Sequence, residues 1–385
     1  MSRPADIDGF DVVGQSDLNG FGDGMQVMRE GDALYVGHFG PTGMGTSILD
    51  VGDPSDPILV RQWKAPPGSH THKVQVAEGL LLVNEEQFRG GEPFTAGMAV
   101  YSLEDPFAPT PIGHFDSGGI GVHRISWTGG DYAYVSATPD GFSGRILVIV
   151  DMTDPERPVE AGRWWTPRPE AGLVPGPADA RPIHHGLVHG SRAYVGMWDR
   201  GMAIVDISDV GRPRTLSTLD WTPGGRSHTC LPLPGRRLVV ATDEATQDGC
   251  GDGPKLARVI DVSDELNPQV LSICPAPVGD FCERGLRFGA HCLHENRPGS
   301  YVSEEIVFVT YFNAGLRVYD LADPAQPVEI AHWIPEIPPG QQEVQINDVF
   351  VDAAGLVYAT DRVQGGVYIL APDERLMARM REAAA

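Results

Sequence analysis

Short apolar runs alternate with polar turns along this chain, and one such pattern recurs over nearly all of its length. In this pattern an apolar run usually ends in aspartate and leads into a turn rich in aspartate and proline. The period is roughly 50 residues, and self-similarity at a fixed period of this size is typical of repeat architectures. The copies begin at Ser47, Ala99, Leu147, Ala203, Ala257 and Leu316, with a degenerate copy at Gly366.

Each repeat unit predicts four β-strands. In the second unit, short apolar runs occupy residues 72–76, 80–84, 98–102 and 110–115, and turn residues separate them. Runs of this length, rich in β-branched residues and bounded by Gly, Pro and Asp, are typical of strands rather than helices. Four-stranded units repeated seven times predict an all-β chain folded as a seven-bladed β-propeller.

The two ends of the chain fit the same prediction. The segment Asp11-Val12-Val13-Gly14 resembles the fourth strand of other units, and the last unit lacks that strand. We therefore expect the N-terminal strand to complete the last blade and close the ring, which removes exposed strand edges. The chain, 1–385, is predicted to be a single domain with a short helix at about 373–382.

Composition and charge restrict the setting in which such a protein works. Hydrophobic residues make up 41% of the chain, enough for a sizeable core, and no apolar run reaches the length of about 18 residues that spans a membrane. A net charge of −23 disfavours nucleic acid and membrane as partners, because both need a basic face. Five cysteines form no CxxC pair and the N-terminus lacks the features of a secretory signal, so we expect a cytoplasmic protein without a disulfide framework. The sequence does not indicate the oligomeric state.

Five histidines occupy one equivalent position, directly before an apolar run, in five successive units. Equivalent positions in a ring of repeats surround a common axis, so these imidazoles should converge. Neutral imidazole binds transition metals well, whereas Mg²⁺ and Ca²⁺ prefer oxygen. The sequence therefore predicts an axial transition metal ion, Fe, Mn, Cu or Zn, as cofactor. The candidate ligands are His72, His123, His185, His228 and His291.

Other polar residues near the same end of the units are candidates to support this ion. Acids at the ends of the second strands are expected to accept hydrogen bonds from ligating imidazoles. These acids are Glu86, Asp199, Glu244 and Asp361. His70 and His184, which shortly precede two axial histidines, are candidates for proton transfer. Asp348 in the seventh unit is a candidate oxygen ligand, base or substrate contact, and the apolar Met25 in the first unit leaves a gap for substrate.

Two long insertions between units should lie over the histidine face and form a substrate wall. Their composition indicates an apolar or aromatic substrate with an anionic or hydroxyl group, and the candidate contacts are Trp164, Trp165, Arg284 and Arg287. The alternative is that the insertions only cap the surface. Cys230 and Cys292 are expected to pack in the core, because strand alternation directs Cys292 away from the side that His291 faces.

The segment Leu147-Val148-Ile149-Val150-Asp151 is a literal copy of the motif that names the LVIVD-repeat proteins, and the other copies are variants of it. The chain resembles this family over essentially its whole length. The resemblance implies a propeller similar to those of the selenium-binding and methanethiol oxidase group, whose cysteine signatures this sequence lacks. More loosely, the chain is similar to carotenoid-cleavage oxygenases and oligogalacturonate lyases, which hold metals on their axes through histidines. The repeat itself implies no reaction.

Together these features predict a metal-dependent enzyme that acts on a small organic substrate, and an aromatic compound is one candidate. The expected reaction is bond cleavage, as a lyase or as an oxidative cleavage, with the ion as Lewis acid or as redox centre. The alternative is a non-catalytic interaction scaffold without metal, in which the repeated histidines are inherited structural caps. A lactonase-type propeller with acidic ligands is a third interpretation, which histidine at the axial positions disfavours.

Overall fold

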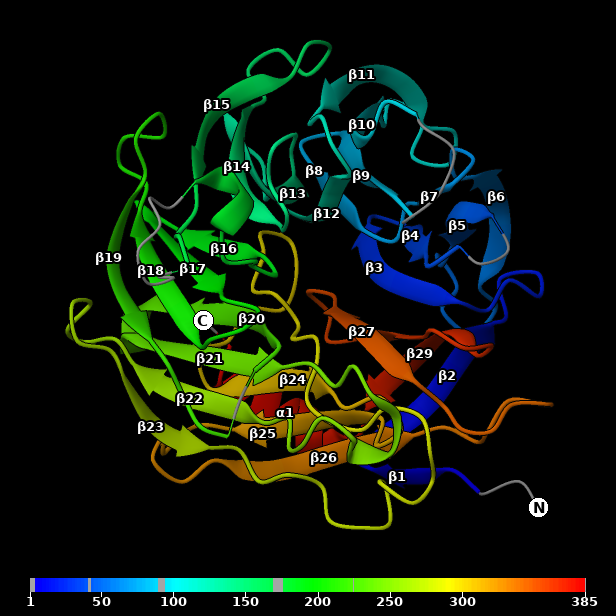
Figure 1. Cartoon of the computed structure of the whole chain (residues 1–385). Coiled ribbons are helices and arrows are strands. Elements are labelled where there is room, and N and C mark those ends of the chain that lie inside the picture. The colour runs from blue at the N-terminus through cyan, green and yellow to red at the C-terminus, as the bar shows by residue number, and fades with distance from the viewer. Residues whose placement is uncertain (1–3, 41–42, 89–93, 169–175, 224, 385) are drawn as a thin grey trace.

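The computed structural model describes residues 4–40, 43–88, 94–168, 176–223 and 225–384. The described residues form antiparallel sheets, mostly of four strands, and in three of these sheets the four strands follow one another in the chain. In Figure 1 these sheets are arranged around a common centre, with the first strand of each unit innermost and the last strand at the rim. The prediction of an all-β fold is confirmed.

Three meanders of four strands make up the first half of the chain. The first consists of β3 (Gly24–Glu30), β4 (Ala33–His38), β5 (Met44–Asp50) and β6 (Ile58–Lys64). The second consists of β8 (Val74–Ala77), β9 (Leu80–Gln87), β10 (Gly97–Ser102) and β11 (Thr110–Asp116), with the short β7 (Ser69–His70) also paired to β9. The third consists of β12 (Gly121–Ser126), β13 (Tyr132–Thr138), β14 (Ile146–Asp151) and β15 (Val159–Trp164). A single pair, Gly121 with Glu86, joins the second and third meanders.

The second half of the chain continues the same arrangement. Two further meanders are β16 (Gly186–His189), β17 (Arg192–Gly196), β18 (Met202–Asp206) and β19 (Arg214–Leu219), then β20 (Ser227–Leu233), β21 (Leu238–Asp243), β22 (Ala257–Asp261) and β23 (Gln269–Ile273). The last sheets contain β24 (Ile306–Thr310), β25 (Leu316–Asp320) and β26 (Val328–Ile334), then β27 (Ile346–Val351), β28 (Val357–Asp361) and β29 (Gly366–Pro372). Short 3₁₀ turns lie at Pro177–Asp179, Pro234–Arg236 and Asp248–Cys250.

Strands from the N-terminus join the last two sheets. The strand β2 (Phe10–Ser16) pairs antiparallel with β29 and so occupies the fourth place of that sheet, while β1 (Asp6–Asp8) pairs with β26. The predicted C-terminal helix is α1 (Glu374–Glu382), and the Asp373 carboxylate caps it by accepting a hydrogen bond from Leu376 N at 2.7 Å. Among the described residues, no helix combines the length and apolar character needed to cross a membrane.

The repeated aspartate closes the turn after the third strand of a unit. The Asp151 carboxylate accepts hydrogen bonds from Thr153 N and Oγ1 at 2.9 and 2.6 Å. Such side-chain-to-backbone bonds define Asx turns, which fix the chain reversal without glycine. Equivalent carboxylate-to-N–H bonds are made by Asp50, Asp206, Asp261 and Asp320.

The apolar run before this aspartate is continuous because both faces of its strand are covered. Leu147 and Ile149 pack against residues of the next unit, including Ile183 and Val195. Their neighbour Val148 belongs to the cluster on the opposite face of the sheet. A strand buried on both faces has no polar alternate positions, which explains the unbroken Leu-Val-Ile-Val run.

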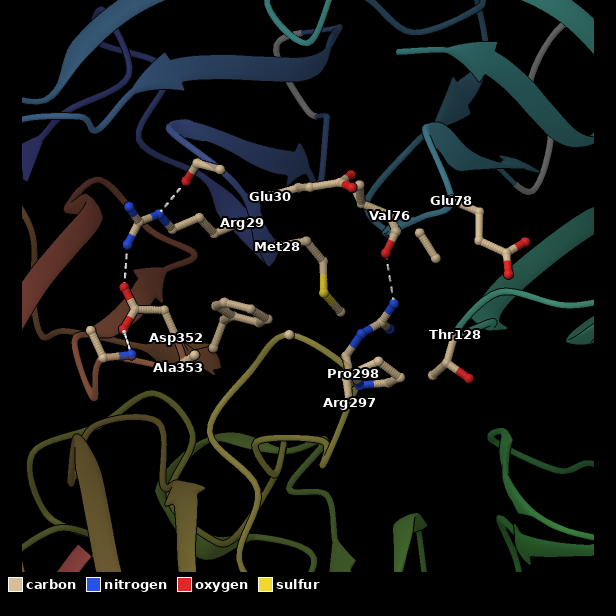
Figure 2. Close-up of a pocket in the computed structure, with 15 residues that line it drawn as sticks. Met28, Arg29, Glu30, Val76, Glu78, Thr128, Arg297, Pro298, Asp352 and Ala353 are labelled. Atoms are coloured by element: carbon tan, nitrogen blue, oxygen red, sulfur yellow. Dashed lines mark hydrogen bonds and ion pairs between the residues drawn. The ribbon is translucent and has the colours of Figure 1, made fainter. Parts of the chain in front are cut away.

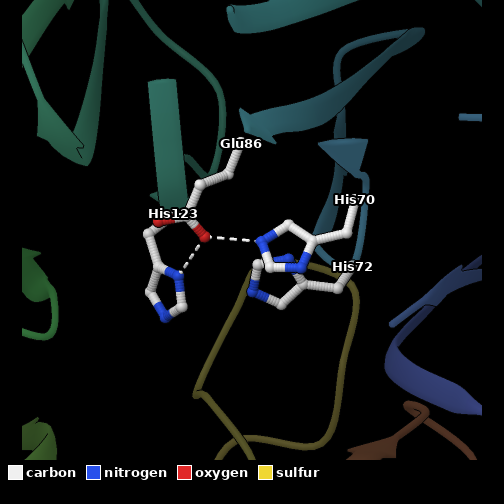
Figure 3. A group of neighbouring side chains, drawn as sticks. All are labelled: His70, His72, Glu86 and His123. Carbon is white, nitrogen blue, oxygen red and sulfur yellow. Dashed lines mark hydrogen bonds and ion pairs between the residues drawn. The ribbon is translucent and has the colours of Figure 1, made fainter. Parts of the chain in front are cut away.

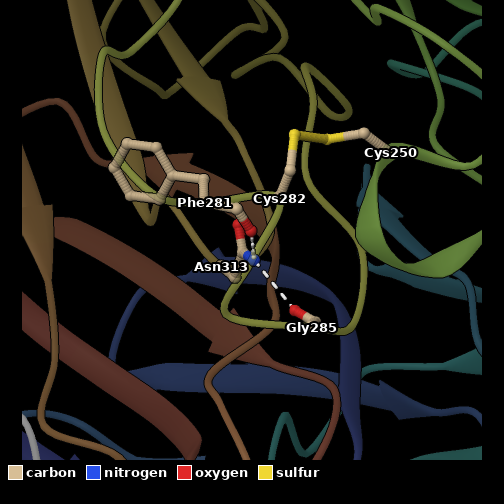
Figure 4. Close-up of a disulfide and its surroundings, with 5 residues drawn as sticks. All are labelled: Cys250, Phe281, Cys282, Gly285 and Asn313. Carbon is tan, nitrogen blue, oxygen red and sulfur yellow. Dashed lines mark hydrogen bonds between the residues drawn. A yellow bond between two sulfur atoms is a disulfide. The ribbon is translucent and has the colours of Figure 1, made fainter.

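One sequence expectation about the cysteines is wrong: Cys250 and Cys282 form a disulfide. The two residues are 32 positions apart and lie in irregular segments after β21 and β23, so no local spacing announces the pair. Asn313 donates hydrogen bonds to Phe281 O and Gly285 O and so anchors the segment that carries Cys282 (Figure 4).

Candidate metal centre

The inner strands of the units share one irregularity, a β-bulge close to the strand start. In β12, Val122 pairs with Ala137 and Arg124 with Ser136, so His123 is the extra residue. The same register shift occurs in β3, β20 and β27. A bulge opposes two residues to one on the neighbouring strand and re-aims their side chains.

Hydrogen bonds place other units in the same register. His184 N donates to Gly196 O, and Gly196 N donates to His185 O; Thr310 is bonded in the same way to the pair 291–292. The first bulge positions are Met25, His72, His123, His184, His228, His291 and Asn347. The second bulge positions are Gln26, Lys73, Arg124, His185, Thr229, Cys292 and Asp348.

In the β16–β19 unit the predicted register is off by one residue. His184 occupies the place of the other axial histidines, and His185 occupies the second bulge position. The spacing of the repeats does not distinguish His184 from His185, because a bulge adds one residue to the strand without any change in the pattern of residue types. His184, predicted as a proton-transfer residue, therefore belongs to what we call the histidine row: His72, His123, His184, His228 and His291.

The rings of the histidine row lie side by side. Ring centroids are 4.8 Å apart for His72 and His123, and 5.0 Å apart for His123 and His184. They are 3.7 Å apart for His184 and His228, and 4.3 Å apart for His228 and His291. Three sets of donor atoms lie within 4.8 Å of one another and so fit a metal ion: His70, His72, Glu86 and His123; His184, His185 and His228; His228, His291 and Cys292.

Glu86 holds two of these imidazoles from the side. Its Oε2 lies 2.6 Å from His70 Nε2 and 2.6 Å from His123 Nδ1 (Figure 3). Burial opposes ionisation of Glu86, but His123 and His70 hold the pKa of its carboxyl well below the usual range. His123 Nε2 is left to face His184 Nε2 at 3.2 Å. Glu86 thus fixes the His123 ring through Nδ1 and leaves Nε2 for a metal, which is the role predicted for it from the sequence.

Other rings of the histidine row are fixed through Nδ1 as well. His291 Nδ1 lies 2.8 Å from Asn347 O and His228 Nδ1 lies 2.7 Å from Thr229 Oγ1, while Asn84 Nδ2 approaches His72 Nδ1 at 3.3 Å. Burial, followed by neighbouring positive charges, lowers the pKa of these imidazoles, and that of His123 to about 3. The rings are therefore neutral, which is the form that binds metal.

The other predicted acids have different partners. Asp199 lies 3.4 Å from Arg168 Nη2 and 3.5 Å from Arg181 Nη1. Asp361 accepts hydrogen bonds from backbone N–H groups, including that of Gln345, and burial raises its pKa to about 6. The structure thus joins neither acid to an imidazole. Carboxylates at strand ends also serve turns and arginines, and the sequence does not distinguish these roles.

Glu244 lies between an arginine and the histidine row. Its Oε1 is 3.1 Å from Arg287 Nη1 and 3.9 Å from His291 Nε2. The predicted substrate contact Arg287 is therefore beside the centre, and its guanidinium lies 5.8 Å from the ring of Phe312, which stacks on His291.

The second bulge positions form a buried charged layer. Arg124 donates to Glu295 Oε1 at 2.9 Å, and its Nη1 lies 3.7 Å from Asp348 Oδ2 and 3.8 Å from Cys292 Sγ. Cys292 is fully buried, as core packing predicts, but its Sγ borders this charged layer instead of facing only apolar side chains. Cys230, by contrast, packs in a hydrophobic cluster as predicted.

The predicted aromatic wall lies elsewhere. Trp164 packs between the third and fourth units and donates Nε1–H to Thr215 Oγ1 at 3.0 Å. Trp165 packs edge-on against Phe142, and Arg284 is bonded to Asp280. Trp164 ends an outer strand, where a side chain faces the neighbouring sheet instead of the pocket.

A cavity of about 480 Å³ opens beside the histidine row, and most of its lining was not predicted from the sequence. Its lining includes His70, Glu86, Arg145, Arg168, Trp198 and Arg226. His70, predicted for proton transfer, thus lies at the edge of this pocket, and we call it the arginine pocket. The missed residues sit at the ends of strands and directly before the bulge of β20, where the repeat has no fixed residue type.

The opposite end of the centre is closed by Arg297. Its guanidinium donates to Gln75 Oε1, Val76 O and Trp127 O, which belong to or directly follow two inner strands. A separate cavity of about 620 Å³ lies outside this closure, between the first, second and seventh units (Figure 2). Two lining residues of the arginine pocket, Glu86 and Trp198, contact imidazoles of the histidine row.

Comparison with known proteins agrees with the repeat and the fold. A family model described as the LVIVD repeat matches residues 125–166, 187–218 and 301–333. Among solved structures, the WD40 β-propeller domain of Doa1 has 9% identity and a TM-score of 0.60, over 95% of this chain and 98% of that one. The periplasmic gluconolactonase PpgL of Pseudomonas aeruginosa has 15% identity and a TM-score of 0.57, over 87% and 93%.

At these identities the likeness concerns the fold alone. The computationally designed protein Ika8 is also similar, with 10% identity and a TM-score of 0.54 over 92% of this chain and 99% of that one. Curated proteins give no significant match. The chain thus carries LVIVD repeats on a β-propeller fold and resembles the LVIVD-repeat propeller proteins in both respects.

Proposed function

We propose that the protein is a metal-dependent enzyme that cleaves a bond in a small organic substrate at the histidine row. The observation that carries this proposal is the meeting of imidazoles from equivalent positions of five units, with His123 Nε2 and His184 Nε2 3.2 Å apart. The wider frame is a closed, seven-bladed propeller formed by one domain. The pairing of β2 with β29 supports closure by the N-terminal strand.

Two features of the donors fit a bound cation. His184 meets nitrogen on both sides, since its Nδ1 lies 2.9 Å from His185 Nδ1. A neutral imidazole carries one N–H, so His184 can donate through only one of these two nitrogens, and the other nitrogen offers a lone pair to a donor or to a cation. In addition, His70 Nδ1 and His185 Nε2 are buried without a hydrogen-bond partner among the described residues. Imidazole ligands favour Fe, Mn, Cu or Zn.

The bound ion would supply a Lewis acid or a redox centre to a substrate beside it. The residues of the chain would orient the metal ligands and transfer protons to or from the substrate. Glu86 keeps His123 turned towards the centre, and His70, at the pocket edge, is the group placed to move a proton. Met25 supplies no imidazole at the first bulge position of its unit, so that unit would add no nitrogen ligand to the ion.

The test is metal content. His123→Ala and His228→Ala should each lose the bound metal measured by elemental analysis and lose turnover with it, while the control His189→Ala, at an exposed position on β16, keeps both. Full metal occupancy in both row variants would overturn the proposal. A wild-type protein without metal would favour the non-catalytic scaffold.

The disulfide bears on the cellular compartment of the protein. The sequence analysis expected the cytoplasm, but disulfides are rare in that compartment. The Cys250–Cys282 bond therefore weighs against the expectation and favours an oxidising compartment. A small molecule remains the predicted partner, with neither nucleic acid nor membrane.

A further inference from the structure

We propose that the arginine pocket binds the carboxylate of a small anionic substrate between Arg145 and Arg226. This inference rests on the proposed function for the statement that the anion is the substrate, but the binding itself does not need the metal. Carboxylate and phosphate share the planar, bidentate recognition that arginine offers, and the experiment below separates them.

Both guanidinium groups are organised by one aromatic ring beside the histidine row. Arg145 Cζ and Arg226 Cζ each lie 5.2 Å from the centroid of the Trp198 ring. Trp198 in turn stacks on His184, with ring centroids 5.6 Å apart and an angle of 24° between the planes. An anion held by the two arginines would therefore sit next to the row.

Within the described part of the chain, neither guanidinium contacts a carboxylate directly, and Glu86 and Glu244 act on Arg145 only at longer range. Among the described residues, no side-chain hydrogen bond or ion pair involves Arg145 or Arg226, whereas Arg168 pairs with Asp199 and Arg287 with Glu244. Burial lowers the pKa of Arg145, which shows that its charge is held at a cost in solvation. A half-buried cation that lines a cavity and has no direct ion pair is a binding group for an anion from outside.

The backbone at Arg226 is strained in a way that aims its side chain. Its φ angle is +66°, in the left-handed region that non-glycine residues rarely adopt. Two hydrogen bonds fix this conformation, from Arg226 N to Trp198 O at 2.6 Å and from Glu244 N to Arg226 O at 2.8 Å. Strain retained in a residue that lines a pocket is typical of functional sites.

The arginines of the pocket contrast with the negative charge of the whole chain. With a net charge of −23, the protein repels anions at long range. The Glu86 carboxylate in the pocket is engaged by His70 and His123. The pocket volume of about 480 Å³ suits a small metabolite rather than a polymer.

The test uses the full chain, both as purified and after treatment with a chelator, titrated calorimetrically with malonate, inorganic phosphate and neutral malonamide. Malonate should bind both preparations, malonamide should not, and Arg145→Gln and Arg226→Gln should each weaken malonate binding by about 10- to 100-fold. The control Arg200→Gln, which loses a surface pair with Asp220, should bind like wild type. Thermal melting verifies that each variant is folded.

The outcomes separate this inference from the metal proposal. Malonate binding to metal-free His123→Ala supports the anion site whatever the metal does. Equal binding of malonate and malonamide, or unchanged malonate affinity in both arginine variants, overturns it. Tighter binding of phosphate than of malonate overturns the assignment to a carboxylate.

Discussion

Replacement of Glu86 by glutamine should weaken metal binding without abolishing it. The carboxylate, whose side chain is 12% exposed, makes two charge-assisted contacts of 2.6 Å, to His70 and to His123. Hydrogen bonds to a charged group are worth about 1.5–3 kcal/mol each. Glutamine keeps the volume and one acceptor but loses the charge, so we expect roughly one such interaction to be lost. Metal affinity should then fall about 10- to 100-fold, as for other residues that orient metal-bound histidine.

The assay is a competition titration of the chelated protein with Zn²⁺ or Co²⁺ in the presence of a chromophoric chelator. Glu85→Gln is the matched control, because Glu85 lies on the same strand and holds the more exposed His114 at 2.9 Å. A Glu86→Gln protein with wild-type affinity would refute the orienting role of the acid. An equal loss in Glu85→Gln would show that the effect is a general one of charge.

Other predictions concern stability. Loss of the 32-residue-spaced disulfide in Cys250→Ser should cost about 3–4 kcal/mol, read as a lower melting temperature that matches that of reduced wild type. Asp243→Ala should cost about 3–5 kcal/mol in urea unfolding, because it leaves Arg258 buried without its partner at 2.6 Å. Glu329 and Asp6 raise the pKa of His332. The contribution of protonated His332 to the free energy of unfolding, below about 1 kcal/mol, is therefore present at pH 6 and lost as pH rises through the raised pKa. His332→Gln should remove this difference in stability between pH 6 and 8.

The repeat could be predicted from sequence because its signals are local. The Asp151 turn and the apolar run before it are set by hydrogen bonds and burial within one unit or between neighbours. The strand near Asp11 was recognised for the same reason, since it carries the pattern of a fourth strand and pairs with β29. The cysteine pair was missed because its two residues are 32 positions apart in segments outside the repeat pattern.

The candidate site was predicted in outline and missed in detail, and bulges are the main reason. A one-residue insertion exchanges the places of His184 and His185 and turns Cys292 towards the charged layer. The pocket residues Arg145 and Arg226 lie outside the repeat pattern, so only their position around Trp198 reveals them.

The bulges would let one ring serve both the proposed metal and the proposed anion. Each inner strand contributes two neighbouring residues, so neutral imidazoles and a charged layer with Lys73 and Arg124 occupy adjacent levels. Burial and these positive charges keep the imidazoles uncharged, which favours metal ligation. A metal ion held by the imidazoles would add positive charge near Arg145 and Arg226. The positive charges of the layer and the pocket would repel further cations. The same charges would strengthen the attraction of the centre for a carboxylate.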